Sequence, residues 1–311
     1  MQPFQKRHVL DHLINRRQSE SMKPSNSIFH SINGLRYHLR TWGEPGNPQL
    51  FLLHGWMDVS ASFQFLVDAL RQNWRVIAPD WRGFGLSEWN QGVYWFQDYL
   101  ADLDALLNSY SPDAPAYLIG HSLGGSVACI YGGVKPERVR RIISLEGFGI
   151  PRNASTEAPR QYAKWLAELS SPPQFKPYAS FAEVAARLKK DNPRLTDDQA
   201  AFLARHWAKQ SDSGTVELLS DPKHKIVNAV LYRLEEAMAC WKNVTAPVLW
   251  VAGSDSWIRD WLKDSPEEFA QRKQAFKNFS ECVIPDAGHM LHHEQPEQVA
   301  KVIEDFLKAT P

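Results

Sequence analysis

One serine in this chain stands in a setting that suits a nucleophile. Ser122 lies at the centre of the sequence Gly-His-Ser-Leu-Gly-Gly, residues 120–125. The apolar residues 116–119 before it predict a buried strand, and residues 126–131 read as the first turns of a helix. A sharp turn between strand and helix, with glycines where the two approach closely, would expose the serine hydroxyl at the N-terminal end of the helix dipole. The pattern predicts a nucleophile elbow rather than a plain glycine-rich connection.

Such a serine needs partners. A serine hydroxyl is a weak nucleophile until a histidine accepts its proton and an acid orients that histidine. The chain has 11 histidines, so their number alone does not select one. The position of each histidine relative to the predicted strands must indicate which one is the base.

Apolar runs that read as strands alternate with helical patterns over most of the chain. The strands that we expect are residues 27–30, 35–42, 50–53, 76–79, 116–119, 141–145, 247–251 and 281–284. Asn33-Gly34 between the first two is a hairpin signal. The alternation predicts an α/β fold, with a mostly parallel eight-stranded sheet covered by helices on both faces. Catalytic groups should then gather at the carboxyl ends of the strands.

The alternation stops between Gly149 and Val244. Capping boxes at Ser180 and Thr196 indicate helices in this stretch, and no segment there is a convincing strand. We expect residues 150–244 to form a helical cap, inserted after the sixth strand, that shapes a pocket and excludes water. The alternative is that this stretch is a plain extension of the scaffold. With residues 150–244 as a cap, the core comprises residues 27–149 and 245–311. A tail or loosely packed helix at residues 1–26 precedes it.

Composition narrows the class of protein. There are 35 acidic and 35 basic residues and no basic stripe, so we expect no nucleic-acid partner. Three widely spaced cysteines argue against a disulfide framework and for a reducing, cytoplasmic location. No stretch approaches the roughly 20 apolar residues of a membrane span. No spacing of potential ligands indicates a metal, and we expect a small-molecule substrate with no cofactor.

Several motifs stand in an order that resembles a known family. They are the elbow, His54-Gly55 after the third strand, Asp-Trp-Arg-Gly at 80–83 after the fourth, and Asp-Ala-Gly-His-Met-Leu at 286–291 before a terminal helix. This set resembles the α/β-hydrolase family over about residues 27–308. The cap sequence and Leu-Glu-Gly-Phe-Gly at 145–149 resemble its serine-hydrolase-like branch. The resemblance implies a serine hydrolase of the α/β-hydrolase fold with an inserted cap.

The resemblance implies a base and leaves the acid open. His289, in the loop before the last helix, matches the catalytic histidine of the family. The family usually places its acid three residues beyond the glycine that ends the seventh strand, where this chain has Ser256, and Asp255 is one residue short. Some members instead place the acid at the end of the strand beside the elbow strand, where Glu146 stands. A carboxylate in that crevice is costly to bury without a partner, which an imidazolium would supply. We favour Glu146, with Asp255 as the alternative.

The remaining site residues follow from the same resemblance. The oxyanion hole should use the backbone N–H groups of Leu123 and Trp56. Side chains that could contact substrate are Trp56, His121, Trp165, Trp207 and Trp257. Aromatic residues more often fill cores, so the cap tryptophans are candidates only.

Two classes of function remain. The first is a serine hydrolase that cleaves a small or medium, apolar carboxylic ester, thioester or lactone through an acyl-enzyme. A serine rather than an aspartate at position 122 argues against haloalkane dehalogenases and epoxide hydrolases. The second is a non-hydrolytic use of the fold as an acyltransferase, lyase or perhydrolase, or, with less support, as a ligand receptor. The sequence makes no prediction about the oligomeric state.

Overall fold

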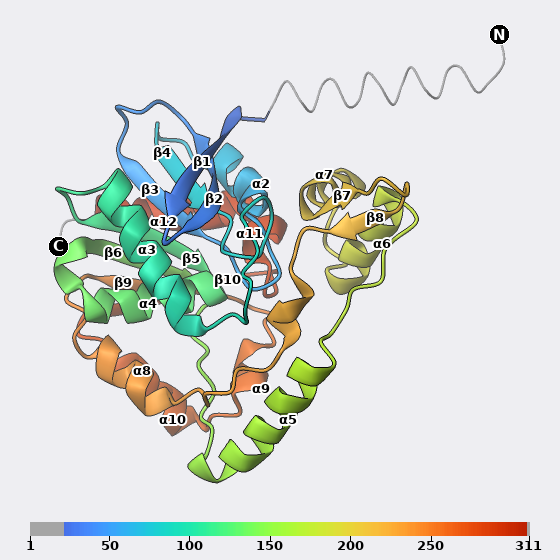
Figure 1. Ribbon diagram of the computed structural model, residues 1–311. Coiled ribbons are helices and arrows are strands. Elements are labelled where there is room, and N and C mark those ends of the chain that lie inside the picture. The colour runs from blue at the N-terminus through green and yellow to red at the C-terminus, as the bar shows by residue number, and fades with distance from the viewer. Residues whose placement is uncertain (1–21, 310–311) are drawn as a thin grey trace.

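The computed structural model describes residues 22–309, which form a layered α/β structure (Figure 1). Its central sheet has eight strands in the order β1-β2-β4-β3-β5-β6-β9-β10. Their bounds are β1 Ser25–Ile32, β2 Leu35–Trp42, β3 Gln49–Leu53, β4 Arg75–Pro79, β5 Ala116–His121, β6 Val139–Leu145, β9 Val248–Gly253 and β10 Phe279–Ile284. β2 pairs antiparallel with β1 and β4, and the other neighbours are parallel. The predicted fold class is confirmed.

Alternate residues of each strand face opposite sides of the sheet, and both sides are covered. In β3, Phe51 and Leu53 belong to one apolar cluster, whereas Leu50 and Leu52 belong to the other. The first cluster is completed by α3 Phe96–Tyr110, α4 Leu123–Val134, α8 Leu234–Trp241 and α10 Pro266–Gln274. The second is completed by η1 Ser60–Phe63, α2 Gln64–Ala69, α11 Leu291–Glu294 and α12 Pro296–Lys308. Within residues 22–309, no helix is both long and apolar enough to cross a membrane.

The segment predicted as a cap is largely helical. It contains η3 Ser155–Glu157, α5 Ala158–Ser170, α6 Phe181–Asp191, α7 Asp197–Trp207, β7 Ala208–Gln210, β8 Val216–Leu218, η4 Pro222–Lys225 and α8. Both expected capping serine/threonine residues begin helices, since Ser180 Oγ accepts from the Glu183 N–H and Thr196 Oγ1 from the Gln199 N–H. The β7–β8 hairpin was not anticipated, because strands of three residues leave too little pattern to recognise.

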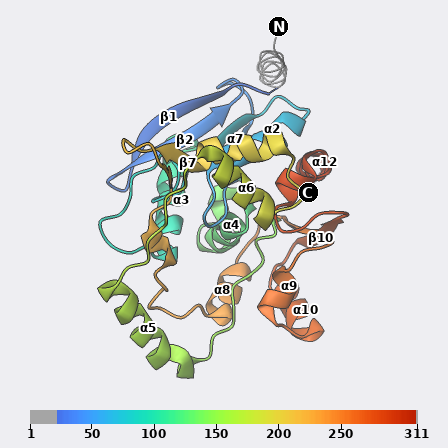
Figure 2. The same cartoon turned by 90° about the vertical axis from the view of Figure 1, so that its right-hand side faces the viewer.

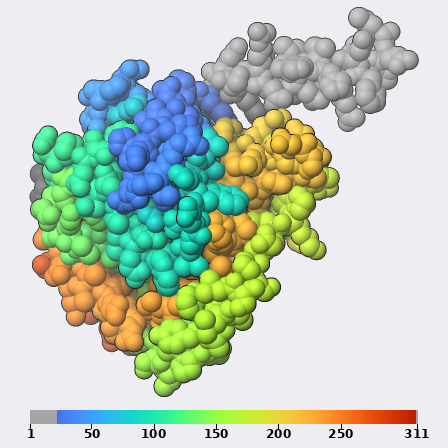
Figure 3. All heavy atoms as spheres, viewed as in Figure 1, coloured from blue at the N-terminus to red at the C-terminus, as the bar shows by residue number. Residues whose placement is uncertain are grey.

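The parts of this segment pack differently. α6 and α7 share a small apolar cluster of their own, which includes Val184, Leu188 and Leu203. In two perpendicular views α5 lies apart from α6 and α7 (Figures 1 and 2), and no residue of α5 is buried. In the space-filling view the segment occupies the right-hand side and lower edge of the molecule (Figure 3). α8, however, packs through Leu234 and Trp241 into a core cluster.

The domain boundary expected at the N-terminus stays a prediction. Residues 1–21 of the predicted tail lie outside the described residues. The first strand begins at Ser25, two residues before the expected core boundary, and runs to Ile32.

Candidate active site

The turn after β5 has the geometry of a strained nucleophile elbow. Ser122 follows the strand directly and is the N-cap residue of α4, with φ 49° and ψ −112°. A non-glycine residue rarely adopts a positive φ, so the surrounding structure must hold it there. A Cβ at Gly120 would lie 2.2 Å from the Gly124 carbonyl carbon, and one at Gly124 would lie 2.0 Å from the Leu53 oxygen. The glycines are therefore required for strand and helix to meet closely around the serine.

Glu146 and His289 meet at the same edge of the sheet. Glu146 follows β6 directly, with φ 58°, and its carboxylate is buried. Its Oε2 lies 3.2 Å from Nδ1 of His289, which comes from the loop between β10 and α11. The Gly253 N–H donates to Oε1 at 2.6 Å, and the Ser256 hydroxyl donates to Oε2. The carboxylate is thus hydrogen-bonded on both oxygens and aimed at the imidazole.

Asp255, the alternative acid, faces another way. Its Oδ2 pairs with Arg194 at the surface, and its Oδ1 accepts from the Ser254 hydroxyl at 3.0 Å. The Asp255 side chain is 49% exposed, whereas that of Glu146 is 0% exposed. Ser256 holds the position where the family resemblance placed the acid, and there it donates to Glu146. The structure brings Glu146, and not Asp255, to His289.

The backbone groups expected to form an oxyanion hole flank the serine. Leu123 is the first residue of α4, directly after Ser122. On the other side, a Cβ at Gly55 would lie 3.3 Å from the Ser122 Cβ, so the turn that carries Trp56 closely approaches the serine. His54 supports that turn, because its Nδ1 bonds the Gly55 oxygen at 2.7 Å and its Nε2 accepts from Trp81 N–H at 2.8 Å. Burial lowers the pKa of His54 to about 4, so it remains neutral in these roles.

A buried ion pair supports the neighbouring loop after β4. Asp80 lies 2.7 Å from Nδ1 of His38 and accepts from the N–H groups of Ser60 and Leu86. Burial alone would raise the pKa of Asp80, but the hydrogen bond and charge of His38 hold it below its usual value. A Cβ at Gly85 would lie 2.2 Å from the Asp80 carboxylate. This motif therefore has a structural role beside the site.

Ser122 lies where two cavities meet. The first has a volume of about 490 Å³, and both Ser122 and His289 line it. Its other lining residues are Trp56, Met57, Asp58, His121, Phe175, Tyr178, Val184, Arg187, Leu188, Asp191, Trp207, Leu218, Lys225 and Met290. The second, of about 660 Å³, is lined by Trp56, Phe96, Ser122, Leu123, Ser126, Glu146, Gly147, Gly149, Ile150, Pro151, Gln161, His224, Lys225, Ile226, Val227, Asn228, Tyr232, Trp257, Ile258 and Trp261.

The predicted substrate contacts divide between these cavities. Trp56 lines both, Trp207 and His121 line the first, and the ring of Trp257 lines the second at 4.6 Å from the His289 ring. Trp165 of α5 lines neither of the two, although Gln161 of the same helix lines the second. His121 is buried, and its Nε2 bonds the His289 oxygen at 2.9 Å. This contact makes His121 a support of the His289 loop as well as a cavity wall.

Sequence reasoning missed several lining residues. Arg187 of α6 and Lys225 of η4 bring positive charge to the first cavity. Neither stands at a recognisable spacing from Ser122, so only their position in the folded chain reveals them. Ser256 could have been recognised from the sequence as a site residue, because it occupies the position where the family usually places its acid.

Comparisons with known proteins show the family of this chain. The alpha/beta hydrolase fold family matches residues 48–296. The chain belongs to the α/β-hydrolase superfamily. The serine hydrolase-like protein of Mus musculus is 34% identical over 289 residues, which cover 87% of this chain and 91% of that protein. The chain is a hydrolase of this superfamily, in its serine-hydrolase-like branch.

Two further matches are named as a hydrolase and as a thioesterase domain. The 2-(acetamidomethylene)succinate hydrolase of Mesorhizobium japonicum is 24% identical over 262 residues, covering 84% of this chain and 88% of that protein. Among solved structures, the thioesterase domain from the curacin biosynthetic pathway matches with a TM-score of 0.78 and 26% identity, covering 90% of this chain and 99% of that chain.

Proposed function

We propose that this hydrolase cleaves a carboxylic ester, thioester or lactone through an acyl-enzyme formed on Ser122. One observation carries the proposal. The Glu146 carboxylate lies 3.2 Å from Nδ1 of His289, while His289 and Ser122 line the same cavity. A serine, a histidine and a buried acid in this relation are the parts of an acyl-transfer triad.

Each residue has a definite role in the proposed mechanism. Glu146 keeps the proton on Nδ1 of His289, so that Nε2 is free to accept the proton of the Ser122 hydroxyl as it attacks the carbonyl carbon. The N–H groups of Trp56 and Leu123 stabilise the oxyanion of the tetrahedral intermediate. His289 then returns the proton to the leaving group, and a water activated in the same way hydrolyses the acyl-enzyme.

The second cavity supports an apolar acyl group. Beyond the reacting residues, its walls are mainly aliphatic or aromatic, among them Phe96, Ile150, Tyr232, Trp257 and Trp261. A site of this kind gains affinity by removing apolar surface from water, at roughly 25 cal/mol per Å². The structural similarity to a thioesterase domain makes thioesters a suitable second substrate class to assay.

The segment 150–244 supports the idea of a lid over the serine. It supplies Tyr178, Val184, Leu188 and Trp207 to the first cavity and Gln161 and Val227 to the second. Removal of bulk water would strengthen the electrostatic interactions of the triad and protect the acyl-enzyme until the attacking water is positioned.

The test combines covalent labelling with turnover. The full chain should react with a fluorophosphonate at Ser122, and should hydrolyse p-nitrophenyl esters of graded acyl length with a preference for small or medium chains. Hydrolysis that is undiminished in a folded Ser122→Ala protein would contradict the proposal. Product formation that requires an added alcohol or amine acceptor would instead indicate a transferase.

A further inference from the structure

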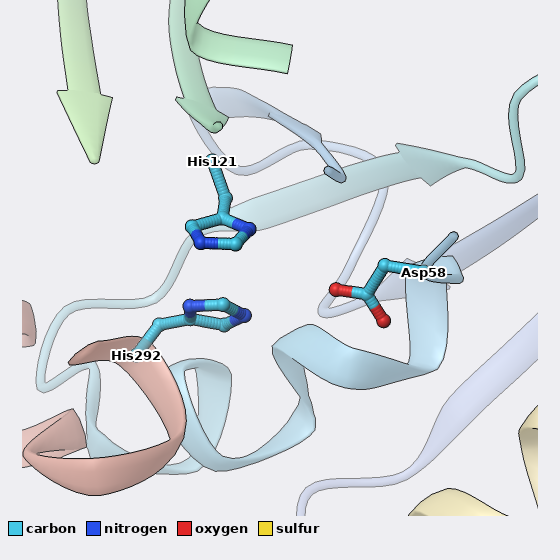
Figure 4. Close-up of side chains that lie close together, drawn as sticks. All are labelled: Asp58, His121 and His292. Atoms are coloured by element: carbon cyan, nitrogen blue, oxygen red, sulfur yellow. The ribbon is translucent and has the colours of Figure 1, made fainter. Parts of the chain in front are cut away.

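Three buried side chains lie together near Ser122. Asp58 follows β3, His121 ends β5 and His292 belongs to α11, and each is at most 2% exposed. Figure 4 shows the two imidazole rings facing one another, with the Asp58 carboxylate directed toward them. One ligand atom from each residue lies within 4.8 Å of the other two.

The polar atoms at the centre of this cluster lack partners. Among the described residues, buried atoms without a hydrogen bond include Asp58 Oδ2, His121 Nδ1 and both ring nitrogens of His292. Leaving a buried polar group unpaired costs about 1–3 kcal/mol. Each of the three side chains thus has an unpaired atom, and one ligand atom from each lies within 4.8 Å of the others, which indicates that the three groups share a ligand.

Surrounding hydrogen bonds orient two of the three groups toward the centre. His121 Nε2 bonds the His289 carbonyl oxygen at 2.9 Å, so Nε2 must carry the proton, and Nδ1 has a free lone pair. Asp58 Oδ1 accepts from the Val59 N–H at 2.8 Å, from Trp207 Nε1 at 3.1 Å and from the Ser62 hydroxyl, which leaves Oδ2 free. Imidazoles and carboxylates that bind metals are held by outer hydrogen bonds of this kind.

We propose that Asp58, His121 and His292 form a binding site for a divalent transition-metal ion. Two imidazoles and one carboxylate are a common ligand set for Zn²⁺, with a fourth position left for water. Asp58 and His121 also line the first cavity, which provides a path of entry. The positions 58, 121 and 292 share no motif, which is why the sequence alone indicates no metal.

The site lies beside the serine without including it. A metal on His121 Nδ1 would hold the ring whose Nε2 bonds the His289 backbone, so binding should stabilise the loop that carries His289. This inference does not depend on the proposed ester chemistry, because metal binding and thermal stability can be measured without a substrate.

The test measures Zn²⁺ binding to the full chain. Isothermal titration with Zn²⁺ alone should show a tight one-to-one site, with a higher Tm in the bound form, and Co²⁺ should give the visible absorption of a four-coordinate ion. Asp58→Asn is a clean variant, because its amide oxygen can still accept the three bonds made to Oδ1 while Oδ2 becomes an NH₂ donor. It should weaken binding by at least about 100-fold, since loss of an outer partner alone typically costs 10–100-fold.

Further variants make the outcome decisive. Trp207→Phe removes one outer hydrogen bond and should weaken Zn²⁺ binding about 10-fold. His292→Leu should abolish the tight site, whereas His30→Gln on β1 should not change it. Equal Zn²⁺ affinity in the wild type, Asp58→Asn and His292→Leu would place the metal elsewhere and overturn the proposal. Failure of both Zn²⁺ and Co²⁺ to bind the wild-type chain would also overturn it.

Discussion

Replacing Glu146 by glutamine tests the proposed triad most sharply. The change keeps the volume of the side chain and removes its charge. Oε1 can still accept from the Gly253 N–H, which places an NH₂ group where Oε2 now faces His289 Nδ1 at 3.2 Å. Since the amide donates, Nδ1 must become the acceptor, and the proton moves to Nε2. An imidazole with that tautomer cannot accept the proton of Ser122.

The expected loss is large. The corresponding acid-to-amide change in a Ser-His-Asp triad lowers kcat about 10⁴-fold. We expect Glu146→Gln to lower kcat for a short p-nitrophenyl ester by about 10³–10⁴-fold, which corresponds to about 4–5.5 kcal/mol of transition-state stabilisation. The circular dichroism spectrum should be unchanged, because the fold loses no packed volume.

Asp255→Asn is the matched control. It makes the same chemical change just after the neighbouring strand β9, on a carboxylate that faces Arg194 and is half exposed. Exposed ion pairs contribute about 0–1 kcal/mol, so turnover should change by less than about fivefold. A large loss of turnover in Asp255→Asn with near-normal activity in Glu146→Gln would refute the assignment of the acid.

Four other measurements follow from the structure. Ser122→Ala should abolish fluorophosphonate labelling, as read by intact-protein mass spectrometry, and lower kcat by several orders of magnitude. Trp257→Ala should shift the acyl-length preference while changing turnover of an acetyl ester little; an unmoved selectivity profile would place the acyl site elsewhere. Gly124→Ala should destabilise the fold by at least about 3 kcal/mol in urea denaturation, because the added Cβ would lie 2.0 Å from a backbone oxygen of β3. The control Gly92→Ala should be nearly neutral, because no atom lies within 4 Å of the Cβ added there. Burial lowers the pKa of His224 to about 3, whereas an unfolded histidine titrates near 6.5. The unfolded state therefore binds the proton first, and the free energy of unfolding should fall as the pH decreases from about 6.5 toward 3, by up to about 1.4 kcal/mol per pH unit. His224→Gln should reduce that slope.

Local patterns in the sequence determined most of the core. All eight strands of the main sheet were expected, because an apolar run bounded by turn residues is a signal that needs no distant partner. The starts of α6 and α7 followed from the capping residues Ser180 and Thr196 for the same reason. The hairpin β7–β8 was missed, since it depends on pairing and not on a pattern within either strand.

The relation between distant side chains was decided only by the tertiary structure. The sequence left Glu146 and Asp255 both open as the acid, because the strands before them end at the same edge of the sheet. The parallel register that pairs Leu145 with Val251, together with the positive φ of Glu146, turns the glutamate toward His289. Asp255 is turned to the surface by the loop after β9. The approach of Asp58, His121 and His292 likewise depends on three separate elements meeting, which no local pattern encodes.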